Sequence, residues 1–232
     1  MWRVLAITTA LSSSMIGSPS VSQDMSTWAD VRSGCVIRQQ YDFSCGLASL
    51  ATILQYEFGL KTSERDLLHE VLALTQDATH APSRLVRNRA RTACGPQVSF
   101  SDGASRNALL ENGASLLQLW CLARMHGVEA FVREADPEFL IRNLDRPIVV
   151  HLTIDNDLEH FAVLRKIDGR WVHLADPRRG CKVYLLTSFL KEWQTRQVLI
   201  LHNENNYTPL TGRLLPEISR DGIERLRSLA NR

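Results

Sequence analysis

The spacing of apolar residues changes once along this 232-residue chain, and this change limits the possible folds more than any other feature. Up to about residue 127, apolar residues recur every three or four positions, which is the spacing of amphipathic helices. After Pro147 they form short apolar or alternating runs between turns, which is typical of β-strands. The chain is therefore predicted to be an α+β protein, with an N-terminal helical half packed on a C-terminal antiparallel β-sheet.

Helices are predicted where polar capping residues precede a periodic segment. The first spans residues 46–58, and the oxygens of Asp42 and Ser44 stand ready to cap it. Two more begin at Ser63 and Ser115. The second half contains a short helix and five predicted strands: Ser188–Trp193, and Ile148–Leu152, Phe161–Arg165, Trp171–Ala175, Val183–Leu186 and Val198–Leu201.

The helical half is interrupted by residues 76–113. Two prolines and three glycines are scattered through this segment, so we predict a mostly irregular insertion with one short helix. It also contains an arginine cluster, which we interpret as a solvated face. The cluster consists of Arg84, Arg87, Arg89 and Arg91.

Both ends of the chain are predicted to lie outside the folded domain. Residues 1–22 have the features of a secretory signal peptide: Arg3, an apolar stretch and a small-residue exit. The alternatives are a disordered or helical N-terminus, or a start at Met25. Residues 23–34 are predicted to be a linker, and residues 203–232 a polar tail with a helix near its end.

The charge balance excludes one class of partner. The 27 Lys and Arg residues against 25 Asp and Glu give a formal net charge of +2, so no nucleic-acid partner is predicted. No stretch reaches the roughly 18 consecutive apolar residues of a membrane-spanning helix. Apart from the signal peptide, no transmembrane segment is predicted.

Five cysteines stand in the sequence, and an odd number leaves at least one thiol unpaired in an oxidising compartment. Cys45 has a distinct context, described below. The other four allow up to two disulfides in one of three connectivities, and buried apolar thiols are the alternative. These four are Cys35, Cys94, Cys121 and Cys181.

Cys45 directly precedes the first predicted helix. The positive end of the helix dipole and the unpaired N–H groups there favour a thiolate, the nucleophilic form of cysteine. The same N–H groups can receive the oxyanion formed when a thiolate attacks a carbonyl, and Gln39 can supply a second donor. Gly46 would let a substrate backbone approach. The alternative is a buried cysteine in a helix cap.

A hairpin is predicted between His160 and Asp176. A two-residue loop would put Phe161 opposite Asp176 and turn His160 to the other face of the sheet. A three-residue loop over residues 167–169, with Gly169 in the left-handed conformation, would put His160 directly opposite Asp176. We predict the three-residue loop, because it also gives the cleaner apolar face. An imidazole could then bond the carboxylate across the strands.

These segments resemble those of the C39 peptidases, the double-glycine or bacteriocin-processing family of papain-like cysteine peptidases. Gln39–Gly46 is similar to the family's Gln-x5-Cys-Gly box, although the family more often has Asp where Ser44 stands. Residues 160–164 and 176–177 are similar to its His and Asp-Pro motifs, in the same order. The resemblance covers about residues 36–202, although the insertion departs from the family pattern.

The resemblance implies a papain-like peptidase domain over residues 35–202. By its motifs, Cys45, His160 and Asp176 are the catalytic triad and Gln39 is an oxyanion donor. No cofactor is implied. The remaining histidines show no metal-ligand spacing, so no metal site is predicted. They are His69, His80, His126, His151, His173 and His202.

The resemblance also implies a function. The chain is similar to exported C39-like proteins of Gram-negative bacteria, including the one encoded with functional-amyloid secretion systems. We therefore expect a periplasmic endopeptidase that cleaves exported peptides or proteins after small-residue or Gly-Gly-like leader sites, supporting secretion or fibril biogenesis with partners from such a system. The alternatives are a non-catalytic or weakly catalytic peptide-binding chaperone or secretion accessory, and acyl or amide transfer by the same residues.

Overall fold

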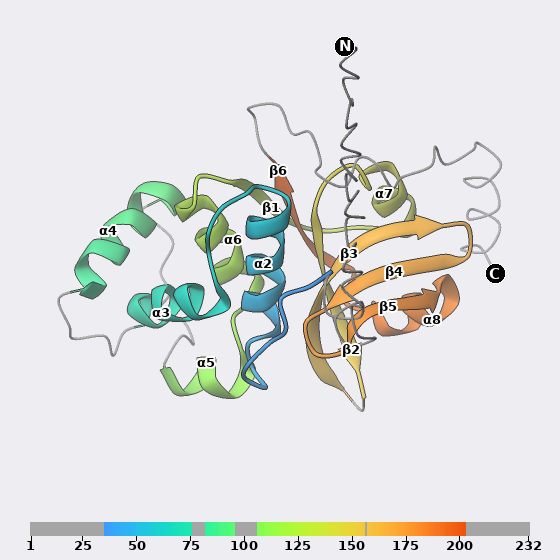
Figure 1. The fold of residues 1–232 in the computed structure, drawn as a ribbon, viewed down its shortest axis with the longest axis horizontal. Helices are drawn as coiled ribbons and strands as arrows, with labels where there is room; N and C mark the ends of the chain where they lie inside the picture. The colour runs from blue at the N-terminus through green and yellow to red at the C-terminus, as the bar shows by residue number, and fades with distance from the viewer. Residues whose placement is uncertain (1–34, 76–81, 96–105, 156, 203–232) are drawn as a thin grey trace, which may run out of the picture.

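The computed structural model describes residues 35–75, 82–95, 106–155 and 157–202, so the predicted signal peptide, linker and tail lie outside it. Helices and strands follow in the predicted order (Figure 1). The helices are α2 (Cys45–Tyr56), α3 (Glu64–Leu74), α4 (Pro82–Cys94), α5 (Arg106–Asn112), α6 (Leu116–Met125), α7 (Pro137–Arg142) and α8 (Leu186–Glu192). The strands are β1 (Glu129–Glu134), β2 (Ile148–Ile154), β3 (Leu158–Asp168), β4 (Trp171–Asp176), β5 (Gly180–Leu185) and β6 (Gln197–His202).

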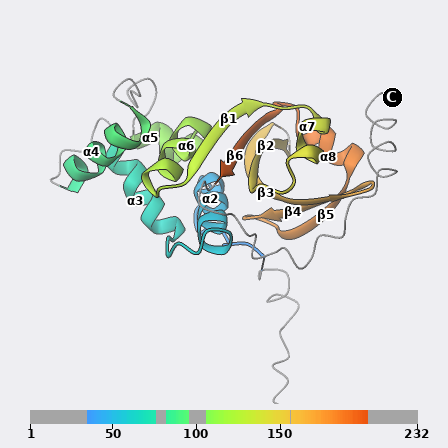
Figure 2. The ribbon, with the colours of Figure 1, turned by 90° about the horizontal axis from the view of Figure 1, so that it is seen from above.

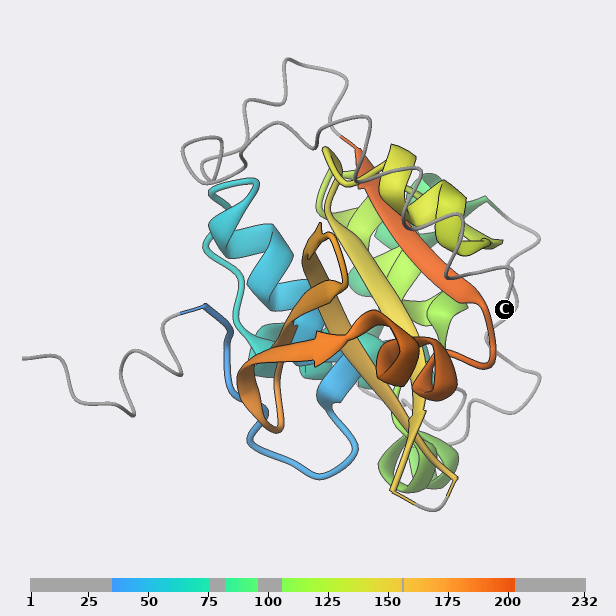
Figure 3. The same ribbon diagram turned by 90° about the vertical axis from the view of Figure 1, so that its right-hand side faces the viewer.

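The strands form one antiparallel sheet in the order β1-β6-β2-β3-β4-β5. Helices α2 and α6 pack on one face of this sheet, with α3 to α5 beyond them (Figure 2). Helix α8 lies in front of the strands when the molecule is seen from the sheet side (Figure 3). The predicted α+β class, with helices first and an antiparallel sheet second, is confirmed.

Two hydrophobic cores hold these layers together. The first lies between the helices and the sheet and includes the buried Leu50 and Leu119. The second lies under α8 and includes Trp193 and Leu152. Because strand side chains alternate between faces, adjacent residues of one strand supply both cores. Each fully buried side chain of this kind contributes about 1.5–3 kcal/mol, so α2 is fixed firmly against the sheet.

The predicted helix starts at Ser63 and Ser115 are confirmed by capping boxes. Ser63 Oγ accepts the N–H of Asp66, whose carboxylate accepts the N–H of Ser63. Ser115 and Gln118 make the same reciprocal pair at the start of α6. Each box satisfies two of the backbone N–H groups that a helix N-terminus leaves without a partner.

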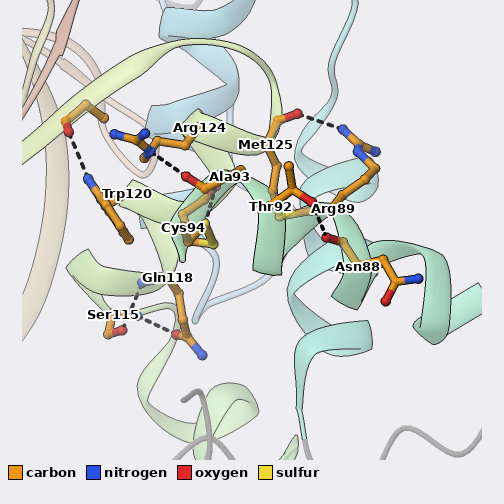
Figure 4. Close-up of a disulfide and its surroundings, with 12 residues drawn as sticks. Asn88, Arg89, Thr92, Ala93, Cys94, Ser115, Gln118, Trp120, Arg124 and Met125 are labelled. Atoms are coloured by element: carbon orange, nitrogen blue, oxygen red, sulfur yellow. Dashed lines mark hydrogen bonds between the residues drawn. A yellow bond between two sulfur atoms is a disulfide. The ribbon is translucent and has the colours of Figure 1, made fainter. Parts of the chain in front are cut away.

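The segment 76–113, predicted to be mostly irregular with one short helix, instead contains the two helices α4 and α5. A disulfide joins Cys94 at the end of α4 to Cys121 of α6. Arg124 of α6 donates to the carbonyl of Ala93 at 2.7 Å, and Arg89 of α4 donates to the carbonyl of Met125 at 2.9 Å (Figure 4). The insertion is therefore attached to the helical half by covalent and polar links.

The five predicted strands are confirmed, but β1 and α7 were not predicted. β1 pairs with β6, the last strand, at an edge of the sheet. Asp136 caps α7 by accepting the N–H of Phe139 at 2.6 Å, and Pro137 occupies its first turn. Within the described part of the chain, no helix is both long and apolar enough to span a membrane.

Candidate active site

Cys45 is the first residue of α2 and is 8% exposed. Of the cysteines, all within the described part of the chain, it is the unpaired one, because the other four form two disulfides. The predicted capping of α2 by the Ser44 side chain is wrong. Its hydroxyl instead donates to the carbonyl of Tyr41 at 2.8 Å and accepts the N–H of Tyr41 at 3.2 Å. Since Ser44 leaves the first-turn N–H groups of α2 uncapped, this helix end favours a negatively charged group.

His160 connects Cys45 with Asp176. Its Nε2 lies 2.9 Å from Asp176 Oδ1, and the side chain of Cys45 lies near enough to raise the pKa of the ring. His160 is 2% exposed and Asp176 is 1% exposed, so the pair is screened from water. The structure thus brings together the three residues predicted from separate segments of the sequence.

Opposing influences set the charges of this pair. Burial alone would lower the pKa of His160, but hydrogen bonds with Asp176 and Cys45 outweigh it and raise this pKa to about 9. Burial likewise acts to raise the pKa of Asp176. The hydrogen bond and charge of His160, with two backbone N–H donors, outweigh it, so the pKa of Asp176 is lowered. A buried imidazolium–carboxylate pair is therefore the stable state at neutral pH.

The turn of the β3–β4 hairpin differs from the prediction. Asp168 pairs with Trp171, which leaves a two-residue turn, so the predicted three-residue loop over 167–169 is wrong. Gly169 has a φ of +56°, as predicted. A positive φ at the first central residue is what a type II′ turn requires, and such turns match the twist of the strands.

A β-bulge directly after Leu164 compensates for the shorter turn. Before the bulge Leu164 pairs with Leu174, and continuing this register puts Asp176 opposite Ala162. Asp176 is therefore two residues away from a position opposite His160, on the same face of the sheet. A long side chain can bridge such diagonal neighbours. The predicted contact is present, but the bulge creates it.

The amide of Gln39 points into its own loop. Its Nε2 donates to the carbonyl of Tyr41 at 2.8 Å and to that of Asp42 at 3.2 Å. These two bonds use both of its N–H groups, while its Oε1 is buried without a hydrogen-bond partner. Gln39 lies beside the site but donates elsewhere in this structure.

A disulfide holds this loop against the Asp176 side of the site. Cys35 is bonded to Cys181 at the start of β5, and the N–H of Gln39 donates to the carbonyl of Pro177 at 3.1 Å. The segment that leads to Cys45 is therefore fixed to the turn that follows Asp176. The two pairings in the structure select one of the three connectivities that the sequence allowed.

Gly46 has a packing role instead of the expected open approach for substrate. A Cβ at this position would meet Leu119 Cδ1 at 3.0 Å and Phe161 Cδ2 at 3.1 Å. These contacts are tighter than ordinary van der Waals packing. The missing side chain thus lets the start of α2 approach both α6 and β3.

A substitution at Gly113, which follows α5, can test whether packing against the helical half holds the loop before Cys45 in place. Its φ is +78°, and a Cβ there would lie 2.4 Å from the carbonyl oxygen of Phe43. Gly127 is a matched control, with a φ of +76° and nothing within 4 Å. Gly127→Ala should lose about 1–2 kcal/mol of unfolding free energy, because alanine disfavours positive φ, and Gly113→Ala should lose more, because its Cβ must also displace the Phe43 carbonyl. Gly113→Ala should in addition slow alkylation of Cys45 by iodoacetamide. Equal alkylation rates in the two variants would contradict this.

Two backbone donors at the site were not predicted. The N–H groups of Arg178 and Arg179 donate to Asp176 Oδ1 at 2.8 and 3.0 Å. The sequence does carry a signal, since Asp often accepts the N–H groups of the turn that follows it, and Gly180 ends this turn with a φ of +84°. Within the described ranges, no group of three or more His, Cys, Asp or Glu residues could hold a metal ion.

Comparison with known proteins gives consistent matches. A model of the peptidase C39 family matches residues 104–206, which include His160 and Asp176. The probable functional amyloid protease FapD of Pseudomonas aeruginosa is 30% identical over 158 residues, which are 68% of this chain and 56% of that protein. The protein of the same name from Pseudomonas fluorescens is 25% identical over 181 residues, 78% of this chain and 66% of that protein. The chain thus spans less than two thirds of both relatives.

Two solved structures share the fold. The peptidase domain of Streptococcus ComA, a bifunctional ABC transporter of a quorum-sensing pathway, gives a TM-score of 0.51 at 19% identity and covers 73% of this chain and 98% of that domain. A protein from Bacillus anthracis described as a C39-like peptidase gives a TM-score of 0.50 at 17% identity, with 73% and 94% covered. At these identities the likeness concerns the fold.

Proposed function

We propose that this chain is a cysteine endopeptidase of the peptidase C39 family, with Cys45 as nucleophile, His160 as base and Asp176 as the residue that orients His160. One observation carries the proposal. His160 hydrogen-bonds the buried Asp176 and interacts electrostatically with the unpaired Cys45 at a helix N-terminus. A nucleophile, a base and an orienting group in this order are what acyl transfer requires.

In the proposed reaction, the Cys45 thiol gives its proton to Nδ1 of His160. Sγ then attacks the carbonyl carbon of the peptide, and an electron pair of the C=O bond moves to the oxygen. The backbone N–H of Cys45 holds this oxyanion, joined by Gln39 once its amide has turned away from the loop carbonyls. The C=O bond then re-forms, the C–N bond breaks, and His160 gives its proton to the leaving amine. Water attacks the resulting thioester and gives a proton to His160, and the C–S bond breaks to regenerate Cys45. Asp176 fixes the proton on Nε2, which leaves Nδ1 facing the sulfur.

The proposed substrates are exported peptides or proteins with small-residue or Gly-Gly-like leader sites, cleaved in the periplasm in support of secretion or fibril biogenesis. The support comes from the two Pseudomonas relatives, whose names describe probable functional amyloid proteases. The two disulfides are typical of an oxidising compartment. Partners from a secretion or amyloid system belong to the same proposal.

A peptide-binding accessory is the second candidate. It is favoured by the 8% exposure of Cys45 and by the loop carbonyls that use both N–H groups of Gln39. A site in this arrangement needs a rearrangement before it can hold an oxyanion. Slow turnover with retained peptide binding would follow if that rearrangement were rare.

The test uses purified protein with its disulfides intact and synthetic peptides with and without a Gly-Gly pair. Wild type should release fragments detectable by mass spectrometry, whereas His160→Ala should release none. Binding of the peptides without any cleavage by wild type would replace the peptidase by the accessory. A lack of both binding and cleavage would reject the proposed substrate class.

The rate of peptide cleavage should fall at high pH. Because the pKa of His160 is raised to about 9, the ring stays protonated at neutral pH and loses its proton as the pH rises through that value. The imidazolium is needed to protonate the leaving amine, so kcat/KM should decline above about pH 9. A pH profile of peptide cleavage measures this. An alkaline limb near 6.5, the ordinary histidine value, would contradict the buried pair.

A further inference from the structure

Arg179 joins three segments around the proposed site. Its Nη2 donates to Asp155 Oδ2 at 2.5 Å, and its Nη1 donates to the hydroxyl of Tyr184 at 3.1 Å. Its backbone N–H donates to Asp176 Oδ1 at 3.0 Å. One residue thus contacts the β2–β3 turn, strand β5 and the carboxylate that orients His160.

The bond between Arg179 and Asp155 matters because of where Asp155 lies. Asp155 follows β2 and has a φ of +40°, a conformation that a non-glycine residue adopts at a cost of roughly 1 kcal/mol or more. The turn that it begins leads into β3, where His160 lies. Asp176 ends the neighbouring strand β4. Arg179 therefore connects the hairpin end that carries His160 with the turn that carries Asp176.

The guanidinium also balances a cluster of carboxyl groups. Glu192 of α8 has a buried Oε2 without a hydrogen-bond partner. Burial raises the pKa of Glu192, the charge of Arg179 opposes that rise, and Asp155 and Asp176 add to it. Arg179 is thus a cation, together with the His160 ring, among three carboxyl groups, and its side chain is only 24% exposed. The planar guanidinium of Arg179 can donate to two partners from two nitrogens, which the single ammonium group of a lysine would do less well.

We infer that Arg179 is a positioning residue: by fixing Asp155 and Tyr184 to the turn after β4, it keeps the carboxylate of Asp176 aligned with His160. The inference depends on the proposed function, because alignment matters for rate only if Cys45, His160 and Asp176 act together. Arg179 itself touches neither Cys45 nor His160 through any of the contacts described above. Its effect is expected on turnover and not on substrate binding.

The first test is kinetic. Arg179→Ala should lower kcat roughly ten- to a hundredfold with little change in KM, since small misplacements of reacting groups have effects of this size. Tyr184→Phe removes one uncharged partner and should give a smaller loss in the same direction. Arg142→Ala is the matched control, because it breaks an arginine–carboxylate pair with Glu138 on α7. Equal kcat in Arg179→Ala and Arg142→Ala would overturn the inference.

The second test separates positioning from general stability. Four titratable groups interact electrostatically with His160: Cys45, Asp176, His151 and Glu192. Of the influences that raise its pKa, the hydrogen bond with Asp176 is the largest, and the charge of Arg179 has no comparable effect. Loosening Asp176 should therefore move the pKa of His160 down from about 9.

NMR titration of the His160 ring reads this pKa without any substrate, with His160→Gln used to assign the signal. Arg179→Ala should shift the midpoint downward, and Arg142→Ala should not. An unshifted midpoint in Arg179→Ala would overturn the positioning role even if no cleavage is seen. If Arg179→Ala shifts the midpoint but the wild-type protein cleaves no peptide, the positioning role of Arg179 is supported and the proposed peptidase function is rejected.

Discussion

Replacing Cys45 with alanine is expected to abolish peptide cleavage, with a loss in kcat on the order of 10⁶. The reason is that the sulfur forms the covalent intermediate and no neighbouring group can substitute for it. Cys45 is the unpaired cysteine of the described domain, and it touches the ring of His160. The measurement is the release of peptide fragments by wild type and variant at equal concentration.

Cys45→Ser is the matched variant, because serine keeps the shape and the hydrogen-bonding capacity of the side chain. It should be nearly as inactive, since His160 does not convert an alcohol into an anion as readily as a thiol. Thermal unfolding should show both variants folded, with Cys35–Cys181 and Cys94–Cys121 intact. Peptide cleavage at the wild-type rate by Cys45→Ala or Cys45→Ser would exclude Cys45 as the nucleophile.

Two substitutions at Asp176 should separate the orientation of His160 from its charge. Oδ1 of Asp176 accepts three hydrogen bonds, from His160 and from the N–H groups of Arg178 and Arg179. Its Oδ2 is buried and has no partner. Asp176→Ala leaves three donors unsatisfied, at about 1–3 kcal/mol for each buried one, and should lower kcat roughly 10³-fold.

Asp176→Asn can keep its oxygen at the Oδ1 position and place its amide where Oδ2 was. It should lose less rate than Asp176→Ala but remove the negative charge. The pKa of His160 should then fall from about 9 by at least about one unit, so the alkaline limb of kcat/KM should move down with it. A limb that stays near pH 9 in Asp176→Asn would mean that Cys45 alone supports the charge of His160.

Much of the fold could be predicted because local patterns agree with it. The capping residues Ser63 and Ser115 precede apolar periodicity, and both helices begin there. Strand β1 was missed because four of its six residues are exposed, so it carries no buried alternation. Its partner β6 is the last of the described strands, separated from β1 by four other strands, and only tertiary pairing reveals it. Helix α4 was missed because Pro82 was interpreted as a sign of irregular structure, whereas it occupies the first helical turn, where proline is well tolerated.

The residues of the candidate site could be predicted from the sequence, but their arrangement could be predicted less well. Cys45, His160 and Asp176 were identified from their local context, and the structure brings them into contact. The bulge in β3 was not predictable from the local pattern. Its extra residue, Arg165, pairs with the buried Glu57 after α2, a contact that only the tertiary structure reveals. The direction of the Gln39 amide was not predictable for a similar reason, since its acceptors are backbone carbonyls of a loop without regular structure.

The bulge also limits how this hairpin can change length during evolution. Residues added at the tip, beside Gly169, leave the pairing of the strands unaltered. One residue gained or lost inside either arm, between His160 and Asp168 or between Trp171 and Asp176, reverses which face the outer end of that arm presents. Such a change preserves the His160–Asp176 contact only if a second one-residue change, or the loss of the bulge itself, accompanies it. Gaps placed in these arms when related sequences are aligned should therefore occur in matched pairs.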